Sequence, residues 1–109
     1  MDDCLFCRIA KSEMGTEFVI ENPDAVVFKD ISPQAPVHLL VVPRRHVADI
    51  TAASAELLGR LFQTANTAAE VAGLKQFRYV INTGAEAGQS VFHLHIHLLG
   101  GRPMTWPPG

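Results

Sequence analysis

The spacing of apolar residues changes along the chain, and this change separates one long helix from several strands. Between Ser54 and Gly73 the apolar residues recur every three or four positions, which places them on one face of a helix. They are Leu57, Leu58, Leu61, Phe62, Ala65, Ala68, Ala69 and Ala72. Gly73 suits the position just after a helix C-terminus. The pattern therefore predicts one long helix over residues 54–73.

Shorter apolar runs, rich in β-branched and aromatic residues, predict the strands of a sheet. They cover residues 17–21, 25–30, 38–42, 77–82 and 91–99. The prolines of segment 32–36 forbid ladder hydrogen bonds and predict a loop, while residues 4–10 can form a short helix. Strands, one helix and further strands with short connections indicate an α+β fold. We expect an antiparallel β-sheet with one long helix packed on it and a short N-terminal helix.

Length and charge limit the kind of protein and of partner. The chain has 109 residues, which predicts a single domain over 1–109. The net charge is −2, and Arg44-Arg45 is the longest basic run, so we expect no nucleic-acid partner. No apolar stretch reaches the roughly 20 residues of a membrane helix, so we expect no membrane partner. The start Met1-Asp2-Asp3 does not resemble a signal peptide, which favours a cytoplasmic protein.

Three of the five histidines fall on the last predicted strand, at alternate positions. Successive side chains of a strand point to opposite faces, so His93, His95 and His97 are expected on one face, roughly 6.6 Å apart. The other face is apolar and carries Leu94, Ile96 and Leu98. Such a concentration of histidine is unusual for a merely solvated face and indicates a functional cleft.

Two kinds of chemistry suit this histidine strand. Alternate histidines on a strand are frequent zinc ligands, so the strand could hold a catalytic metal. Alternatively, a neutral imidazole is a capable nucleophile at pH 7, and its neighbours could contact phosphate. The preceding segment 84–90 contains two glycines and Ser90, and its backbone N–H groups could cradle an anion. Geometry alone leaves both readings open.

The two cysteines, Cys4 and Cys7, form a C-x2-C pair. Such a pair occurs as half of a zinc site, as a redox dithiol or as two unrelated thiols. The redox interpretation requires a strand before the pair, and none is predicted. Zinc requires two further ligands, for which His46 and His93 are available.

The histidine strand resembles the signature of the histidine-triad (HIT) family, His-φ-His-φ-His-φ-φ with φ apolar. The resemblance runs from about Cys4 to the C-terminus. Segments 30–38, 42–46 and 88–91 and the tail 100–109 are similar to the Hint branch of that family, which the ending Trp-Pro-Pro-Gly distinguishes. The resemblance implies a HIT-like fold and hydrolysis of purine nucleoside phosphoramidates or related AMP derivatives. In this mechanism His95 attacks the α-phosphorus and forms a nucleotidyl-histidine intermediate.

The resemblance also implies roles for individual residues. It places His97 and His38 around the phosphate oxygens, and Ser90 as a donor to phosphate or the leaving group. The expected nucleotide contacts are Asp30 and Asn82 at the ribose, Ile31 at the base, and Gly88, Gln89, Ser90, His95 and His97 at the phosphate. Without the family, Asp30 and Asn82 read equally well as turn residues. The tail of Hint proteins crosses a twofold interface, so we expect a homodimer in which Trp106 reaches the partner's site.

Relatives with an N-terminal C-x2-C pair hold a structural zinc. The resemblance therefore implies a zinc site made by Cys4, Cys7, His46 and His93. Two other functions stay open at this stage. One is a purine-nucleotide-binding regulatory module whose chemistry is incidental, and the other is a zinc-dependent metallohydrolase that uses the triad as ligands.

Overall fold

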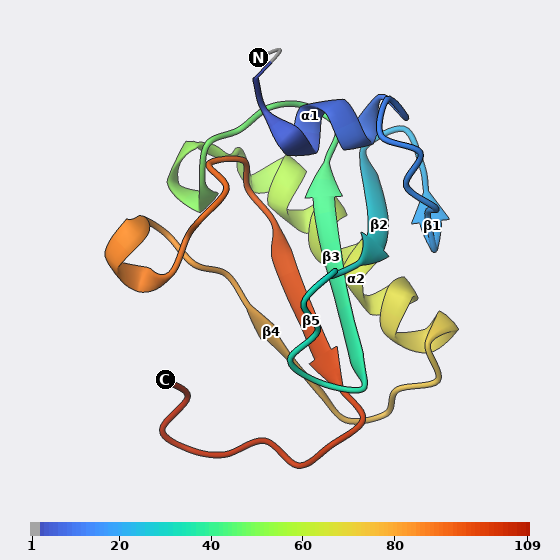
Figure 1. The fold of residues 1–109 in the computed structure, drawn as a ribbon, viewed down its shortest axis with the longest axis vertical. Coiled ribbons are helices and arrows are strands. Elements are labelled where there is room, and N and C mark those ends of the chain that lie inside the picture. Colours follow the sequence, from blue (N-terminus) through green and yellow to red (C-terminus); the bar gives the residue numbers. More distant parts are fainter. Residues whose placement is uncertain (1–2) are drawn as a thin grey trace.

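The computed structural model describes residues 3–109. The expectation that the chain start is not a signal peptide rests partly on Met1 and Asp2, which lie outside the described residues. The described residues form five strands and two α-helices, whose arrangement Figure 1 shows. The elements are α1 (Leu5–Ala10), β1 (Ile20–Glu21), β2 (Ala25–Lys29), β3 (Val37–Pro43), α2 (Ala55–Val71), β4 (Phe77–Val80) and β5 (Ile96–Gly100). Two short 3-10 turns span Ile50–Ala52 and Ala85–Ala87. In the described part of the chain, no helix is long and apolar enough to cross a membrane.

The strands form one antiparallel sheet in the order β1-β2-β3-β5-β4. The predicted α+β architecture, with an antiparallel sheet, one long helix and a short N-terminal helix, is confirmed. The central pair is β3 and β5, in which Val41 lies opposite Ile96 and His38 opposite Leu99. This register places the start of β3 beside the end of β5, where two of the predicted catalytic histidines meet.

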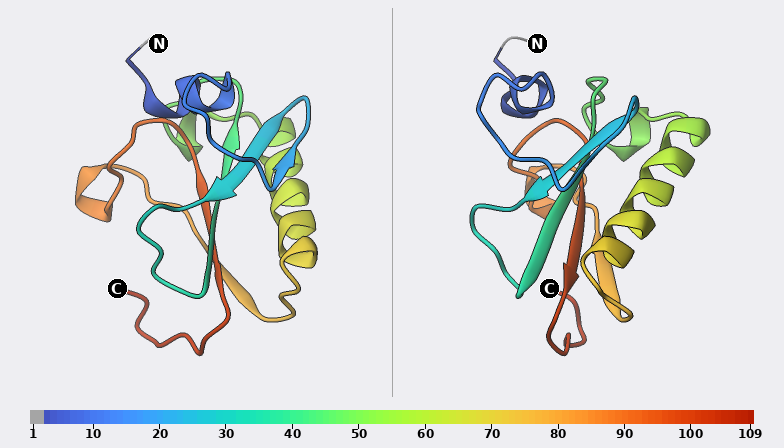
Figure 2. Two further views of the ribbon diagram at one scale, coloured as in Figure 1. Left: turned by 45° about the vertical axis from the view of Figure 1, so that its right-hand side comes forward. Right: turned by 90° about the vertical axis from the view of Figure 1, so that its right-hand side faces the viewer.

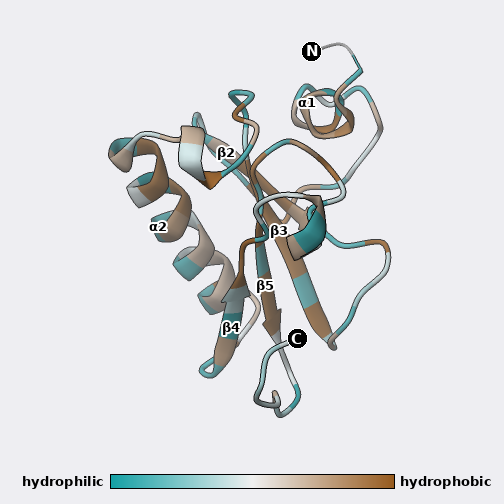
Figure 3. Ribbon diagram, turned by 90° about the vertical axis from the view of Figure 1, so that its left-hand side faces the viewer, coloured by the Kyte–Doolittle hydropathy of each residue, from teal (hydrophilic) through white to brown (hydrophobic). Residues whose placement is uncertain are grey.

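Helix α2 forms as its sequence pattern predicts. The Ser54 hydroxyl accepts a hydrogen bond from the Leu57 N–H and caps the helix, and Gly73 follows it with a positive φ of 74°. All eight residues of the predicted apolar stripe pack in the core between α2 and the sheet. Figure 2 shows α2 lying along one face of the sheet, and Figure 3 shows apolar positions along the helix on its sheet side.

The short helix α1 lies over the opposite face of the sheet (Figure 2). Alternate residues of the strands therefore enter two different cores. Val27 and Val41 pack toward α2, whereas Phe28 and Leu40 pack with Phe6 of α1. This double burial explains the apolar runs Ala25–Phe28 in β2 and Leu39–Pro43 in β3. It also brings the cysteine-bearing helix onto the sheet face that carries the histidines.

Two predicted strands are wrong in their extent. The predicted strand 17–21 shrinks to Ile20–Glu21, and the predicted strand 91–99 becomes Ile96–Gly100. Continuing the register between β3 and β5 would place Pro43 opposite Leu94, and proline has no N–H to donate to a ladder. The Leu94 N–H instead donates to the Val47 carbonyl at 2.7 Å.

The shorter β5 changes the arrangement of the triad. Only His97 lies on a strand, while His93 and His95 lie in the bent segment before it. The ring centroids of His95 and His97 are 4.9 Å apart rather than the expected 6.6 Å. The three imidazoles therefore do not form one even row on a strand face. The apolar partners Leu94, Ile96 and Leu98 do pack together in the core beneath α2, as expected.

Candidate functional site

The ring of His95 has a fixed orientation. Its Nδ1 lies 2.8 Å from the carbonyl oxygen of His93, and a carbonyl can only accept a hydrogen bond. His95 Nδ1 therefore carries the proton and donates it to this carbonyl. The Nε2 atom is left with its lone pair. Because the side chain is buried, the local backbone holds the imidazole in the form in which Nε2 can act as a nucleophile.

Phe6 packs against this imidazole, a contact that the sequence analysis missed. The Phe6 and His95 ring centroids are 5.0 Å apart with an interplanar angle of 86°, an edge-to-face arrangement. Phe6 also meets the ring of Phe28 at 5.7 Å. The sequence offered one indication of this contact: Phe6 lies between Cys4 and Cys7, so an aromatic residue shares the short N-terminal helix with the thiols.

His38 and His97 form a pair at the edge of the triad. His38 Nε2 lies 2.9 Å from His97 Nδ1 and 3.3 Å from the Asp30 carboxylate. Burial lowers the pKa of His38, although the Asp30 carboxylate acts in the opposite direction. Burial, helped by the neighbouring imidazoles of His95 and His38, lowers the pKa of His97 to about 4. Both rings are therefore neutral at pH 7.

The protons of this pair can be assigned from one backbone group. The Gln34 N–H donates to His38 Nδ1 at 3.0 Å, so His38 Nδ1 is the acceptor and its Nε2 carries the proton. His38 then donates to His97 Nδ1, which leaves His97 with its proton on Nε2. The same three side chains, Asp30, His38 and His97, also lie close enough for a metal cluster. The protonated Nε2 of His38 favours the hydrogen-bonded reading, because a metal needs that atom's lone pair.

A second cluster brings together Cys4, Cys7, His46 and His93, and their ligand atoms all lie within 4.8 Å of one another. Cys4 Sγ lies 3.3 Å from His93 Nδ1, and Cys7 Sγ lies 3.3 Å from His46 Nδ1. A tetrahedral zinc with ordinary bond lengths would separate sulfur and nitrogen ligands by about 3.6 Å. Two thiols and two imidazoles at this spacing fit a closed structural zinc site.

The protonation of His93 also suits a metal ligand. Its Nε2 lies 2.8 Å from the Pro43 carbonyl and donates to it, so the lone pair of Nδ1 faces the thiols. Burial lowers the pKa of His93, which keeps the ring neutral, whereas burial raises the pKa of the Cys7 thiol. A bound cation would reverse the second effect and stabilise the thiolate.

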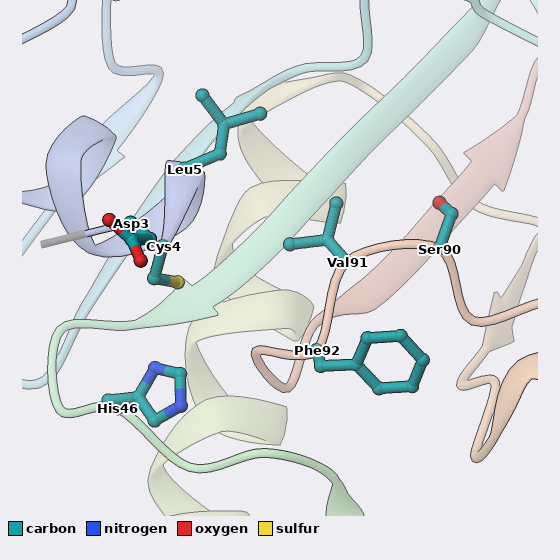
Figure 4. A pocket seen from close by; sticks show the side chains of 7 residues that line it. All are labelled: Asp3, Cys4, Leu5, His46, Ser90, Val91 and Phe92. Atoms are coloured by element: carbon teal, nitrogen blue, oxygen red, sulfur yellow. The ribbon is translucent and has the colours of Figure 1, made fainter. Parts of the chain in front are cut away.

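A hollow of about 440 Å³ opens beside this cluster. Figure 4 shows Cys4 and His46 on one side of it and Ser90 and Phe92 on the other. The hollow therefore borders the cluster of two cysteines and two histidines, and His95 does not line it. A second hollow of about 400 Å³ includes Asp30 and His38 in its lining together with Val71 and Ala72 at the end of α2, and His97 does not line it.

The loop before the triad is held by its own hydrogen bonds. Gly84 and Gly88 have φ values of 89° and 101°, which L side chains rarely adopt. The Gly88 N–H donates to Ala85, and the Gln89 N–H donates to Gly84. The buried Gln89 side chain accepts from the Gly84 N–H and donates to the carbonyl of Ala48. Gln89 therefore shapes the loop from inside, and exposed Ser90 offers its hydroxyl at the loop's end.

The remaining predicted nucleotide contacts lie around the edge of this region. Asp30 accepts from the Ser32 N–H, as a turn residue would, and its second oxygen faces His38. Ile31 is 99% exposed. Asn82 donates to the Gly88 carbonyl at 3.5 Å. Trp106 is 82% exposed on the C-terminal tail, where the guanidinium of Arg78 lies 6.0 Å from its ring centroid.

Comparisons with known proteins identify the family and agree with the fold. The HIT domain profile matches residues 11–104. An uncharacterized HIT-like protein of Synechocystis sp. is 47% identical over 99% of this chain and 98% of its own length. A HIT family hydrolase from Legionella pneumophila superposes with a TM-score of 0.94 at 45% identity and covers 98% of this chain and 100% of its own. A HIT family hydrolase from Clostridium thermocellum gives 0.92 at 40% identity, with 96% of both chains covered. The chain belongs to the HIT domain family.

Proposed function

We propose that this protein hydrolyses purine nucleoside phosphoramidates or related AMP derivatives at the α-phosphate. His95 Nε2 forms a bond to the phosphorus while the P–N bond breaks, and the leaving amine takes up a proton from solvent. Water then attacks the nucleotidyl-histidine, returns one proton to solvent, releases the nucleoside monophosphate and restores neutral His95. Positioning and charge stabilisation contribute most to such a transfer, so it needs no strong base.

The observation that carries this proposal is the hydrogen bond from His95 Nδ1 to the His93 carbonyl at 2.8 Å. It fixes the tautomer whose lone pair is on Nε2, the atom that must attack. Solved structures at 45% and 40% identity are named HIT family hydrolases, which supports a hydrolase. A purine-nucleotide-binding module with no chemistry of its own would not require this fixed, buried nucleophile.

The groups around His95 supply the rest of the site. In the proposal, His97 Nε2–H donates to a phosphate oxygen and His38 supports it from behind. Ser90 donates to phosphate or the leaving group, and Gly88 and Gln89 shape the phosphate loop. Asp30 and Asn82 bind the ribose, and exposed Ile31 borders the base.

The test is a trapping experiment with an adenosine phosphoramidate. We expect acid-quenched reactions of the wild type to show adenylate on the peptide that contains residue 95. His95→Gln, which preserves volume and polarity, should lose both the adduct and turnover while still binding AMP. Turnover that survives in His95→Gln would refute the nucleophile. Nucleotide binding without any turnover in the wild type would support the regulatory module instead.

We also propose that Cys4, Cys7, His46 and His93 hold a structural zinc ion. Zinc would supply a fixed tetrahedral link between α1 and the segment before β5. Because all four ligands come from the protein, the site has no open position for water, which disfavours the zinc-dependent metallohydrolase. Elemental analysis should give about one equivalent of zinc for the wild type and for Asp30→Asn, and almost none for Cys7→Ser. Loss of zinc in Asp30→Asn with full zinc content in Cys7→Ser would overturn the assignment.

A homodimer is proposed on the exposed edge of the sheet. Strand β4 ends the strand order, and Phe77 on it is 40% exposed. A second copy could pair along this strand and bring its Trp106 toward the neighbouring site. Light scattering should give twice the chain mass of 11.9 kDa, and Phe77→Glu should shift it toward the monomer. A monomer for the wild type at high protein concentration would refute the dimer.

A further inference from the structure

The start of the C-terminal tail is bound to the loop between β2 and β3. Arg102 Nε and Nη2 both donate to the Gln34 carbonyl, at 3.1 and 3.0 Å, and Nη1 donates to the Pro103 carbonyl at 3.0 Å. The chain can cross here because Gly101 has no side chain. A Cβ at Gly101 would lie 2.9 Å from Pro36 Cβ, and its φ of 92° also suits glycine.

Within segment 32–36, Gln34 is the residue whose backbone dihedral angles the prolines do not restrict. Pro33 and Pro36 fix their own φ angles and restrict the residues before them. The carbonyl and the N–H of Gln34 lie on either side of its Cα. Anchoring the carbonyl by Arg102 therefore limits the directions in which the N–H can point.

That N–H is the group that assigns the protons of the catalytic pair. It donates to His38 Nδ1 at 3.0 Å, and His38 Nε2 lies 2.9 Å from His97 Nδ1. If the N–H turned away, only the Asp30 carboxylate, 3.3 Å from His38 Nε2, would still favour the proton on that nitrogen, and some of the rings could carry it on Nδ1. With the proton on Nδ1, His38 Nε2 would accept rather than donate, and His97 would have to place its own proton on Nδ1. His97 Nε2 would then be an acceptor facing an anionic phosphate.

We propose that Arg102 is a positioning residue that acts through the Gln34 backbone to keep His38 and His97 in their Nε2–H tautomers. Arg102 touches neither imidazole directly in this proposal. The expected effect of Arg102 on the rate of hydrolysis rests on the proposed phosphoramidase function. Its expected effect on the tautomers of His38 and His97 does not. If Arg102 merely fastened the tail to the protein, its loss would leave the ring protons unchanged.

The first test measures the tautomers without substrate. Long-range ¹H–¹⁵N spectra distinguish a protonated from an unprotonated ring nitrogen in each histidine. We expect Nε2–H for His38 and His97 in the wild type, and a mixture of tautomers in Arg102→Met. Arg78→Met is the matched control, because Arg78 also binds the tail, by donating to the Thr105 carbonyl at 3.1 Å. This variant should leave the tautomers of both rings unchanged.

Arg102→Lys keeps the charge but not the planar fork, and it provides a milder variant if Arg102→Met folds poorly. It should give a smaller shift in the same direction. Wild-type tautomers in both variants at position 102 would overturn the proposal. So would an equal change in Arg78→Met, since that would indicate a general effect of loosening the tail.

The second test measures kinetics with an adenosine phosphoramidate. Arg102→Met should lower kcat by about threefold to tenfold with little change in KM, because the lost hydrogen bond supports a group that acts on the phosphate. Arg60→Met, which removes an exposed arginine beside Asp24, should match the wild type. A rise in KM with unchanged kcat would contradict the positioning role. If the wild type shows no turnover, the proposed function fails while the tautomer test still decides the role of Arg102.

Discussion

The depressed pKa of His97 predicts that the protein loses stability in mild acid. The ring has a pKa of about 4 in the folded protein, against an ordinary value of 6.5. Between these values the unfolded chain binds a proton that the folded chain does not, so stability must fall as the pH falls. The contribution of His97 is complete above pH 6.5, declines below it, and is fully lost once the pH falls through about 4.

The size of the effect follows from the same two values. The difference between 6.5 and about 4 corresponds to at most about 3 kcal/mol. His97 is only partly buried, so solvent screens part of this energy, and we expect about 1–2 kcal/mol. His38 and His93 also have lowered pKa values from burial and will add to the acid sensitivity of the whole protein.

Urea unfolding at pH 7.5 and pH 4.5 measures this contribution when the wild type is compared with His97→Asn. Asparagine can accept from His38 and does not titrate in this range, so the variant removes the His97 proton specifically. The loss of unfolding free energy between the two pH values should be about 1–2 kcal/mol smaller in His97→Asn. Equal losses in the two proteins would show that the acid sensitivity arises elsewhere and would refute the reasoning.

Three further predictions concern the frame of the site. Leu61→Ala removes a fully buried side chain between α2 and the sheet and should lower the free energy of unfolding by about 2–5 kcal/mol in urea. Ser54→Ala removes the hydroxyl that caps α2 through the Leu57 N–H and should cost about 1 kcal/mol in the same measurement. Gly101→Ala should cost at least about 1 kcal/mol, since φ is 92° and Pro36 is too close, and crystallography of the variant should show a displaced tail.

The sequence predicts best where a single periodic pattern decides the structure. The apolar stripe of α2 is such a case, because any other conformation of residues 55–71 would expose several leucines and alanines at once. The four cysteine and histidine side chains of the proposed zinc site also meet as expected, although they come from three separate segments. Their identification depended on a family pattern, since nothing local in the sequence links Cys4 to His93.

The sequence predicts less well where a distant backbone group decides the structure. Alternation of histidines over 93–97 suggested one regular strand, but the absence of an N–H at Pro43 ends the ladder that would have extended it. The contact between Arg102 and Gln34 joins residues 68 positions apart. Both residues lie in segments that resemble the family, but nothing in either segment indicates that the two meet, so only the folded structure shows the contact. Long-range contacts of this kind produce no periodic pattern in the sequence from which they could be predicted.

The ring nitrogens of the triad show how one backbone can give three histidines different chemistry. His93 Nε2–H donates to the Pro43 carbonyl, so the lone pair of Nδ1 of that ring faces the thiols. His95 Nδ1–H donates to the His93 carbonyl, so Nε2 of that ring keeps its lone pair. His97 Nδ1 instead accepts a hydrogen bond from His38, so its Nε2 carries the proton. A metal held at His93 would therefore also fix the carbonyl that orients His95. The alternating motif identifies the three residues, and the hydrogen-bond partner of each ring determines which of its nitrogens keeps a lone pair.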